Sequence, residues 1–218
     1  MDSQRLNELE SQGDWRGLAA ALATCIEEAT DQAERSALHL RLGNVLVDKL
    51  LQAPTALKHY QTAWKLQPAS GEPLCAASAI YWQLGKFKMV EMVLRKALEC
   101  SEGVERGATL LELGAACCDQ EKYSEAKSAF EAAAEADDSL DDDVLALLLD
   151  LSATEDDYKE RCEEIKGEAA DAPAEKAVGF FLRGARVAAR FDESLFEEFA
   201  LAAYRADSEN TQATAVFE

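Results

Sequence analysis

The stretch LGNVLVDKLLQAPTALKHYQTAWKLQP at residues 42–68 decides the fold, because its pattern of small and large residues returns twice further along the chain. The three matching sets are Leu42-Gly43, Ala56, Tyr60 and Ala63, then Ala77-Ser78, Val90, Leu94 and Ala97, then Leu113-Gly114, Ala126, Phe130 and Ala133. Matching residues are 34 or 35 positions apart between the first two sets and 36 between the last two. A period in the mid-thirties with helical spacing inside each unit predicts a solenoid of stacked helical hairpins.

Helix signals inside the first unit agree with this interpretation. Apolar residues recur at three- and four-residue intervals, at Leu38, Leu42, Val45 and Leu46. This spacing predicts an amphipathic helix that begins near Ser36. Pro54 suits the first turn of a second helix and Pro68 suits its end. The unit is therefore expected to be one helical hairpin.

The repeated small residues have a steric explanation. Where two helices cross closely, a side chain larger than alanine would push the backbones apart. We therefore expect the small residues of the first helices to meet those of the second, at Gly43 with Ala56, Ser78 with Val90, and Gly114 with Ala126. The large side chains are expected to fill the space between successive hairpins, at Tyr60, Leu94 and Phe130.

The composition favours helices that bury a core and restricts the partners. Hydrophobic residues make up 48% of the 218 residues, and only four prolines and eleven glycines interrupt the chain. The formal net charge is 22 − 42 = −20, and residues 135–171 hold fifteen acidic and three basic side chains. Phosphate backbones and anionic lipids repel such a polyanion, so we expect neither nucleic acid nor a membrane surface as a partner.

The six cysteines do not form a disulfide framework in this pattern. Cys117 and Cys118 are adjacent, the others lie singly within helical segments, and no C-x-x-C pair is present. Free thiols in a reducing compartment are the better interpretation. The chain begins without a basic and apolar leader and lacks a run of about 18 apolar residues, so we expect a cytoplasmic protein.

Few residues suggest chemistry. His39 and His59 lack a zinc-type spacing, and the paired cysteines lie in a helical, alanine-rich segment without a nearby base. The aspartate clusters at 141–143 and 156–157 lack the calcium-loop pattern and suit helix N-termini. Phosphate-binding loops and nucleophile elbows are absent from the sequence. We therefore expect no enzyme activity, no cofactor and no metal.

The repeat resembles the tetratricopeptide repeat family. Residues 36–137 carry the match, through Leu42, Gly43, Leu46, Ala56, Tyr60, Ala63 and Pro68, then Tyr81, Gly85, Phe87, Leu94 and Ala97, then Leu113, Gly114, Tyr123, Ala126, Phe130 and Ala133. Departures are Ser78 with Val90, an inserted residue before Pro54, and no terminal proline in the later units. The resemblance implies an all-α fold, a right-handed superhelical solenoid of antiparallel helix-turn-helix hairpins.

The chain then divides around the three clear units. They are predicted at 36–69, 71–104 and 107–138, after a degenerate N-terminal hairpin at 1–35, in which Asp14 could cap the second helix. Two degenerate hairpins are predicted within 139–209. Residues 210–218 are expected to form either a capping helix or the start of a truncated repeat.

In this family the first helix of each hairpin lines the concave groove. Mapped residue by residue, the resemblance implies a partner-binding groove of Leu40, Asn44, Val47, Asp48, Cys75, Ala79, Trp82, Gln83, Leu111, Ala115, Cys118 and Asp119. Asn44 matches a family asparagine that often contacts the ligand backbone. The basic residues that clamp a C-terminal carboxylate in some members are replaced here, by Leu40, Ala76, Ala108 and Glu112. Trp82 is either an exposed anchor or packed against the next hairpin.

These expectations favour a non-catalytic scaffold or adaptor that holds a peptide or helix of a partner protein in the concave groove. Acidic edges at Asp48 and Asp119 would favour an amphipathic segment with Lys or Arg. Two alternatives remain. The chain could be a self-assembling module whose last helix docks on another copy, giving a homo-oligomer. It could also be the regulatory part of a longer enzyme or signalling protein.

Overall fold

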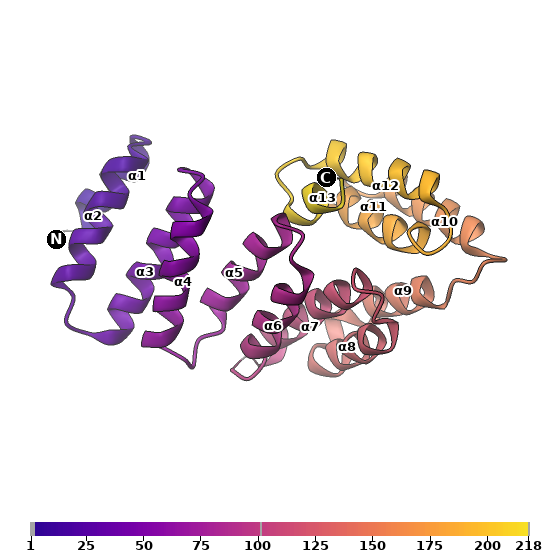
Figure 1. Ribbon diagram of the computed structural model, residues 1–218, viewed down its shortest axis with the longest axis horizontal. Coiled ribbons are helices and arrows are strands. Elements are labelled where there is room, and N and C mark those ends of the chain that lie inside the picture. The colour runs from indigo at the N-terminus through magenta and orange to yellow at the C-terminus, as the bar shows by residue number, and fades with distance from the viewer. Residues whose placement is uncertain (1–2, 101, 218) are drawn as a thin grey trace.

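The computed structural model describes residues 3–100 and 102–217, which form thirteen α-helices, one short 3₁₀ helix and no strand (Figure 1). The helices are α1 (Ser3–Ser11), α2 (Trp15–Glu28), α3 (Gln32–Asp48), α4 (Ala53–Leu66), α5 (Glu72–Gln83), α6 (Phe87–Ala97), α7 (Gly103–Cys118), α8 (Tyr123–Ala136), α9 (Asp141–Ser152), α10 (Tyr158–Asp171), α11 (Ala174–Ala188), α12 (Glu193–Ala206) and α13 (Thr211–Phe217), with η1 at Asp138–Leu140. Residues 1, 2, 101 and 218, which belong to the predicted ranges 1–35, 71–104 and 210–218, lie outside the described residues. The predicted all-α fold is confirmed.

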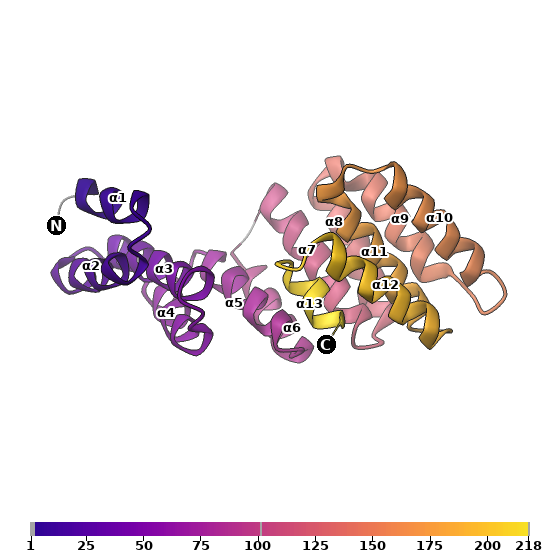
Figure 2. The same ribbon diagram turned by 90° about the horizontal axis from the view of Figure 1, so that it is seen from above.

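Helices pack in pairs as antiparallel hairpins, except that α9 and α10 pack mainly on other helices, and each hairpin packs on its neighbour. Within hairpins α1 pairs with α2, α3 with α4, α5 with α6, α7 with α8, and α11 with α12; contacts between α2 and α3, α4 and α5, α6 and α7, and α8 and α9 join successive units. Figures 1 and 2 show the resulting elongated stack. The predicted solenoid is therefore observed.

Local signals account for several helix ends. Asp14 Oδ1 accepts a hydrogen bond from Gly17 N at 2.9 Å, so it caps α2 as expected. Asp31 caps α3 by accepting from Glu34 N at 2.8 Å, and this cap starts the helix at Gln32, four residues before the expected start. Asp141, Asp142 and Asp143 occupy the first turn of α9.

Glycines of the hairpins lie directly against an aromatic ring. A Cβ added to Gly43 would lie 2.4 Å from Cε1 of Tyr60, and one added to Gly114 would lie 2.2 Å from Cε1 of Phe130. Each ring lies over the glycine of its own hairpin, so Tyr60 and Phe130 fill the space that Gly43 and Gly114 leave. Because glycine has no Cβ, the ring can approach the facing backbone closely.

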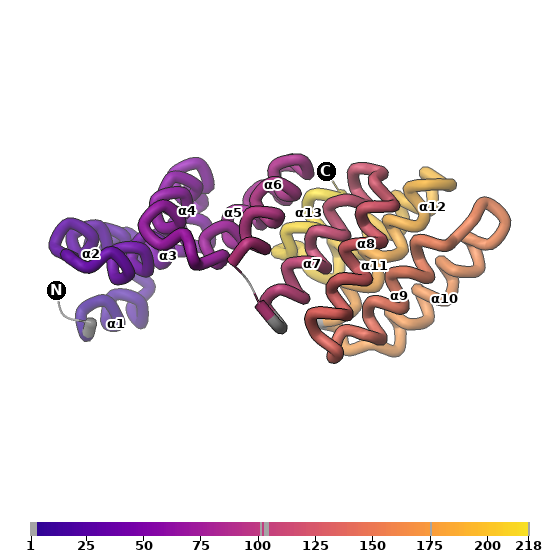
Figure 3. The backbone as a smooth tube through the Cα atoms, turned by 90° about the horizontal axis from the view of Figure 1, so that it is seen from below, coloured from indigo at the N-terminus to yellow at the C-terminus, as the bar shows by residue number. Residues whose placement is uncertain are grey.

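The C-terminal part of the chain folds back on the middle of the stack. Helix α9 packs against α8 and α11, and α10 packs against α11. Helix α13 contacts α11 and α12 and also α5, which lies more than a hundred residues earlier in the sequence (Figures 1 and 3). The first helices of the middle units are therefore covered by the chain's own C-terminal helices.

Candidate interaction groove

The first part of the predicted groove lies on α3 and is accessible. Asn44 and Asp48 are exposed, and Leu40 and Val47 are half-buried beside them. Because these four residues follow helical spacing, they share one face of α3. This face combines apolar surface with one amide and one carboxylate.

Asn44 is held in place by a residue of the core. The hydroxyl of Tyr60 donates to Asn44 Oδ1 at 2.8 Å, which leaves the Nδ2 amide free to donate to a ligand. The Tyr60 ring is buried over Gly43. Burial, and then the nearby charge of Asp48, raises the pKa of Tyr60 to about 12, so its hydroxyl keeps its proton at neutral pH.

Asp48 provides an unpaired negative charge at the end of this face. Among the described residues it forms no ion pair. The nearest pair on the same helix joins Arg41 Nη2 to Glu10 Oε2 of α1 at 2.6 Å. The carboxylate of Asp48 is therefore available to a cation.

The second part of the groove, on α5, is largely packed. Trp82 is 1% exposed, with its ring edge-on to that of Phe87 at 5.3 Å, so of our two alternatives the packed one is observed and an exposed anchor is excluded. Cys75 is half-buried, with Sγ 3.9 Å from Oγ1 of Thr109, and burial raises its pKa to about 11. Ala79 is half-buried and Gln83 is exposed.

The third part, on α7, is closed by the chain itself. Arg186 of α11 donates from Nε to Asp119 Oδ1 at 2.9 Å, and its Nη2 donates to Gln212 of α13 at 3.0 Å. The Arg186 guanidinium also lies 6.0 Å from the centre of the Trp82 ring. Asp119 is therefore neutralised internally, and its expected role as a free acidic edge was wrong.

The remaining α7 residues line the space between α7 and the C-terminal helices. Leu111 and Ala115 border a cavity of about 480 Å³ whose opposite wall is formed by α11 and α13. Cys118 lines a neighbouring pocket with Tyr123 and Arg190, and burial raises the pKa of its thiol to about 12. The twelve predicted residues thus divide into an open part on α3 and a covered part on α5 and α7.

The covering residues were missed from the sequence. Arg186 lies 67 positions after Asp119, and no local pattern pairs them. One signal was present in the sequence, where Gly184 and Phe199 repeat the glycine and aromatic pair of the earlier hairpins. In the structure a Cβ added to Gly184 would lie 2.2 Å from the Phe199 ring. That pair identifies α11 and α12 as a regular hairpin of the stack.

Potential metal ligands are already neutralised. Glu91, Cys117 and Glu125 bring three ligand atoms within 4.8 Å of one another. However, Lys122 Nζ lies 2.6 Å from Glu91, and Arg95 bonds both Glu91 at 2.9 Å and Glu125 at 2.6 Å. Burial also raises the pKa of the Cys117 thiol, which disfavours the thiolate. Two cations therefore occupy the place that a metal would take.

The six cysteines are free thiols, and the two histidines contact each other. His39 Nδ1 lies 2.9 Å from His59 Nδ1, at hydrogen-bond distance across the α3–α4 hairpin. Within the described part of the chain no helix has both the length and the apolar character needed to cross a membrane.

Solved structures resemble this arrangement. No protein-family model and no curated protein sequence matches the chain. YrrB, a tetratricopeptide-repeat protein described with an unusual peptide-binding site, is 18% identical over 89% of this chain and 96% of its own, with a TM-score of 0.53. PilF of Pseudomonas aeruginosa is 18% identical over 96% and 92% (TM-score 0.58), and MamA is 14% identical over 87% and 96% (TM-score 0.52). The chain therefore has the tetratricopeptide-repeat fold, a right-handed superhelical solenoid of antiparallel helical hairpins.

Proposed function

We propose that the protein is a non-catalytic interaction scaffold that binds a peptide or helix of a partner protein on the open face of α3. The observation that carries the proposal is the Asn44 amide, which is exposed and fixed by the Tyr60 hydroxyl. A preorganised donor loses little side-chain entropy on binding. The fold it shares with YrrB, described as having a peptide-binding site, supports the same class of function.

Each residue of the face has a role in this proposal. The Asn44 amide donates to a backbone carbonyl of the bound segment, and Leu40 and Val47 contact its apolar side chains. Asp48 pairs with a Lys or Arg of the segment, which gives the preference for basic partners. Trp82 and Asp119 take no part, since internal contacts already occupy them.

The absence of catalysis is part of the proposal. Burial raises the pKa of Cys75, Cys117, Cys118 and Cys162, so these thiols stay protonated and poorly nucleophilic. His39 and His59 bond each other and not a nucleophile. Helix α13, which we considered as a dock for another copy, packs on its own chain.

Affinity purification from a lysate of the source cells, with mass spectrometry, tests the proposal. The variant Asn44→Ala/Asp48→Lys removes the amide and reverses the charge, and Glu135→Lys makes the same charge change at an exposed site on α8. We expect a partner recovered with wild type and Glu135→Lys to fall about tenfold or more with the α3 variant, which corresponds to about 1.4 kcal/mol. Equal recovery with all three proteins contradicts the proposal.

A further inference from the structure

A second apolar groove lies between α4 and α6, away from the face of α3. Its volume is about 520 Å³, within the usual range of ligand sites, and α5 forms its floor. Large apolar side chains line it, at Trp64, Tyr81, Met89 and Met92. Met92 is 55% exposed and Trp64 is half-buried. Methionine and tryptophan are common at protein interfaces because they offer large apolar surfaces, and methionine also adapts its shape.

The same position one hairpin further on is different in character. Residues 34 or 36 positions later are smaller or polar, with Leu98 for Trp64, Cys117 for Tyr81, Glu125 for Met89 and Ser128 for Met92. There Arg95 Nη2 of α6 bonds Glu125 Oε2 of α8 at 2.6 Å and bridges the two helices. No such ion pair crosses the α4–α6 groove among the described residues. The apolar lining is therefore specific to this groove.

The charged side chains of the groove are both lysines. Lys58 of α4 and Lys96 of α6 are exposed at its rim. Lys96 Nζ lies 5.8 Å from the centre of the Trp64 ring and also pairs with Glu99 of its own helix end. In a chain of net charge −20, this is an apolar surface with a positive rim. It is complementary to an apolar helix that carries carboxylates.

Helix α9 of the same protein has that chemistry. Leu145 and Leu149 are 58% and 49% exposed and lie four residues apart, so they form one stripe of the helix. Asp141 and Asp142 are exposed in its first turn. Figures 1 and 2 show α9 and the α4–α6 pair well separated along the long axis, so the two surfaces of one molecule do not meet.

We propose that α9 of a second copy of this chain docks in the α4–α6 groove. Leu145 and Leu149 insert between Trp64 and Met92, and the aspartates of the first turn face a lysine of the rim. The two surfaces differ, so the contact is heterologous and is made either twice in a closed dimer or successively in a chain of copies. A single helix in a groove is a small interface, and the net charge opposes it, so we expect association only above about 10 µM.

Sedimentation of the full chain from about 5 to 500 µM tests this contact. Wild type is expected to shift from monomer to larger species, and Met92→Glu and Leu145→Glu are each expected to raise the midpoint tenfold or more. Leu51→Glu is the matched control, because Leu51 is 86% exposed and lies outside both surfaces. Circular dichroism verifies that each variant keeps its helices.

Mixing supplies the decisive result. Met92→Glu keeps an intact α9 and Leu145→Glu keeps an intact groove, so an equimolar mixture is expected to form one-to-one dimers that neither variant forms alone. Similarly, Lys96→Glu and Asp142→Lys should each weaken association, and the double variant should restore it. A wild type that stays monomeric over the whole range, variants that associate like wild type, or a mixture that stays monomeric overturns the proposal. None of these outcomes bears on the α3 face, so the two proposals fail independently.

Discussion

The first two hairpins (α1–α4, the open part) and the helices from α7 to α13 (the closed part) are held together by different kinds of interaction. In the open part, an apolar cluster begins at Leu6 and continues to Ile80 of α5, and polar contacts such as the His39–His59 and Tyr60–Asn44 pairs lie near it. In the closed part, arginines of α11 tie together helices that are distant in sequence. The comparison shows that local pairs build the stack and that long-range ion pairs close it.

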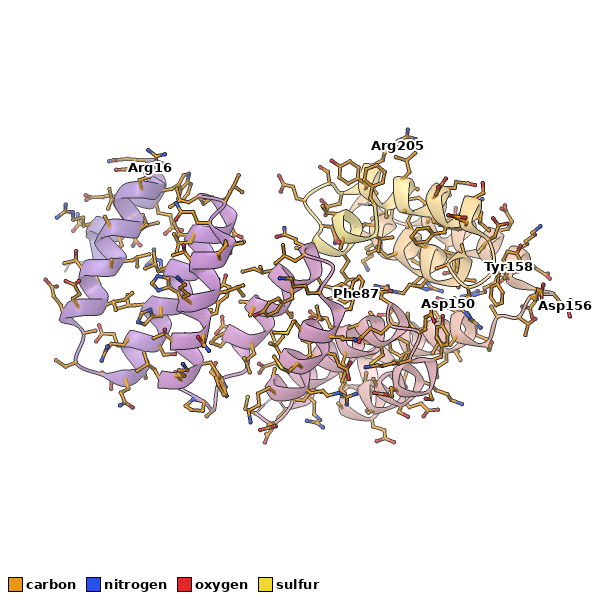
Figure 4. The ribbon with its side chains drawn as sticks, viewed as in Figure 1. Arg16, Phe87, Asp150, Asp156, Tyr158 and Arg205 are labelled. Atoms are coloured by element: carbon orange, nitrogen blue, oxygen red, sulfur yellow. The ribbon has the colours of Figure 1, made fainter. Side chains whose placement is uncertain are left out.

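The ion pairs of the closed part centre on α9. Asp150, labelled in Figure 4, is 6% exposed and accepts hydrogen bonds from Arg161 Nε at 2.8 Å and from Arg183 Nε at 2.6 Å. Arg190 donates to backbone carbonyls at the end of α9, including Ala153 O at 2.8 Å, and lies 5.0 Å from the Tyr123 ring. Buried charges of this kind are costly when unpaired. Because of these buried charges, we expect polar substitutions to destabilise the closed part more than the open part.

The largest effect is expected from Asp150→Ala. Removing the shared carboxylate leaves Arg161 and Arg183 buried with too few acceptors, which should lower the free energy of unfolding by about 3–5 kcal/mol. Asp156→Ala, at an exposed turn, is the control and should change it by less than about 0.5 kcal/mol. Urea unfolding followed by circular dichroism measures both. A loss below about 1 kcal/mol for Asp150→Ala would mean that the closed part does not depend on this network.

Arg186→Gln should open the covered groove. Asp119 then loses its cation and Trp82 loses the guanidinium over its ring. We expect the free energy of unfolding to fall by about 1–3 kcal/mol. In a Trp15→Phe/Trp64→Phe background, Trp82 emission should shift to the red and become quenchable by acrylamide as water reaches the ring. Arg205→Gln, exposed at the end of α12, should leave the emission unchanged (Figure 4). Emission that does not move in Arg186→Gln would show that α11 stays in place without this pair.

The glycine and aromatic pairs are common to both parts, so substitutions at these glycines should destabilise the open and the closed part to a similar extent. Gly43→Ala and Gly184→Ala each place a Cβ within 2.4 Å of a ring and should destabilise by about 1–3 kcal/mol. Gly179→Ala, with open space around it inside α11, should stabilise by about 0.5–1 kcal/mol. Thermal unfolding compares the three. Clearly unequal losses of stability at Gly43 and Gly184 would show that the glycine and aromatic pairs do not contribute equally to the two parts.

The same contrast explains what the sequence could predict. Hairpins recur because each unit buries the same small and large residues, so period and spacing were enough to place the helices of residues 36–137. The closure was not predictable, since Asp119 and Arg186 pair only after three more helices, α8, α9 and α10, have set the direction of α11. The groove residues on α3 are accessible in the structure and their role in binding stays a prediction, whereas Trp82 was open to two interpretations until its environment was known.

The smallest effect is expected from pH in the open part. Burial, and then His59 and Arg35, lowers the pKa of His39 below the reference of 6.5, and burial lowers that of His59. Because the unfolded chain binds protons more readily, the pair stabilises the fold fully above about pH 6.5 and loses this contribution as pH falls through the lowered pKa values. Between about pH 7.5 and about pH 5.5 we expect the free energy of unfolding to fall by less than about 1 kcal/mol. This fall should be absent in His39→Gln/His59→Gln. Urea unfolding at each pH, with NMR titration of the imidazole protons, measures it. Imidazoles that titrate above 6.5, or an unchanged pH dependence in the double variant, would contradict the assignment.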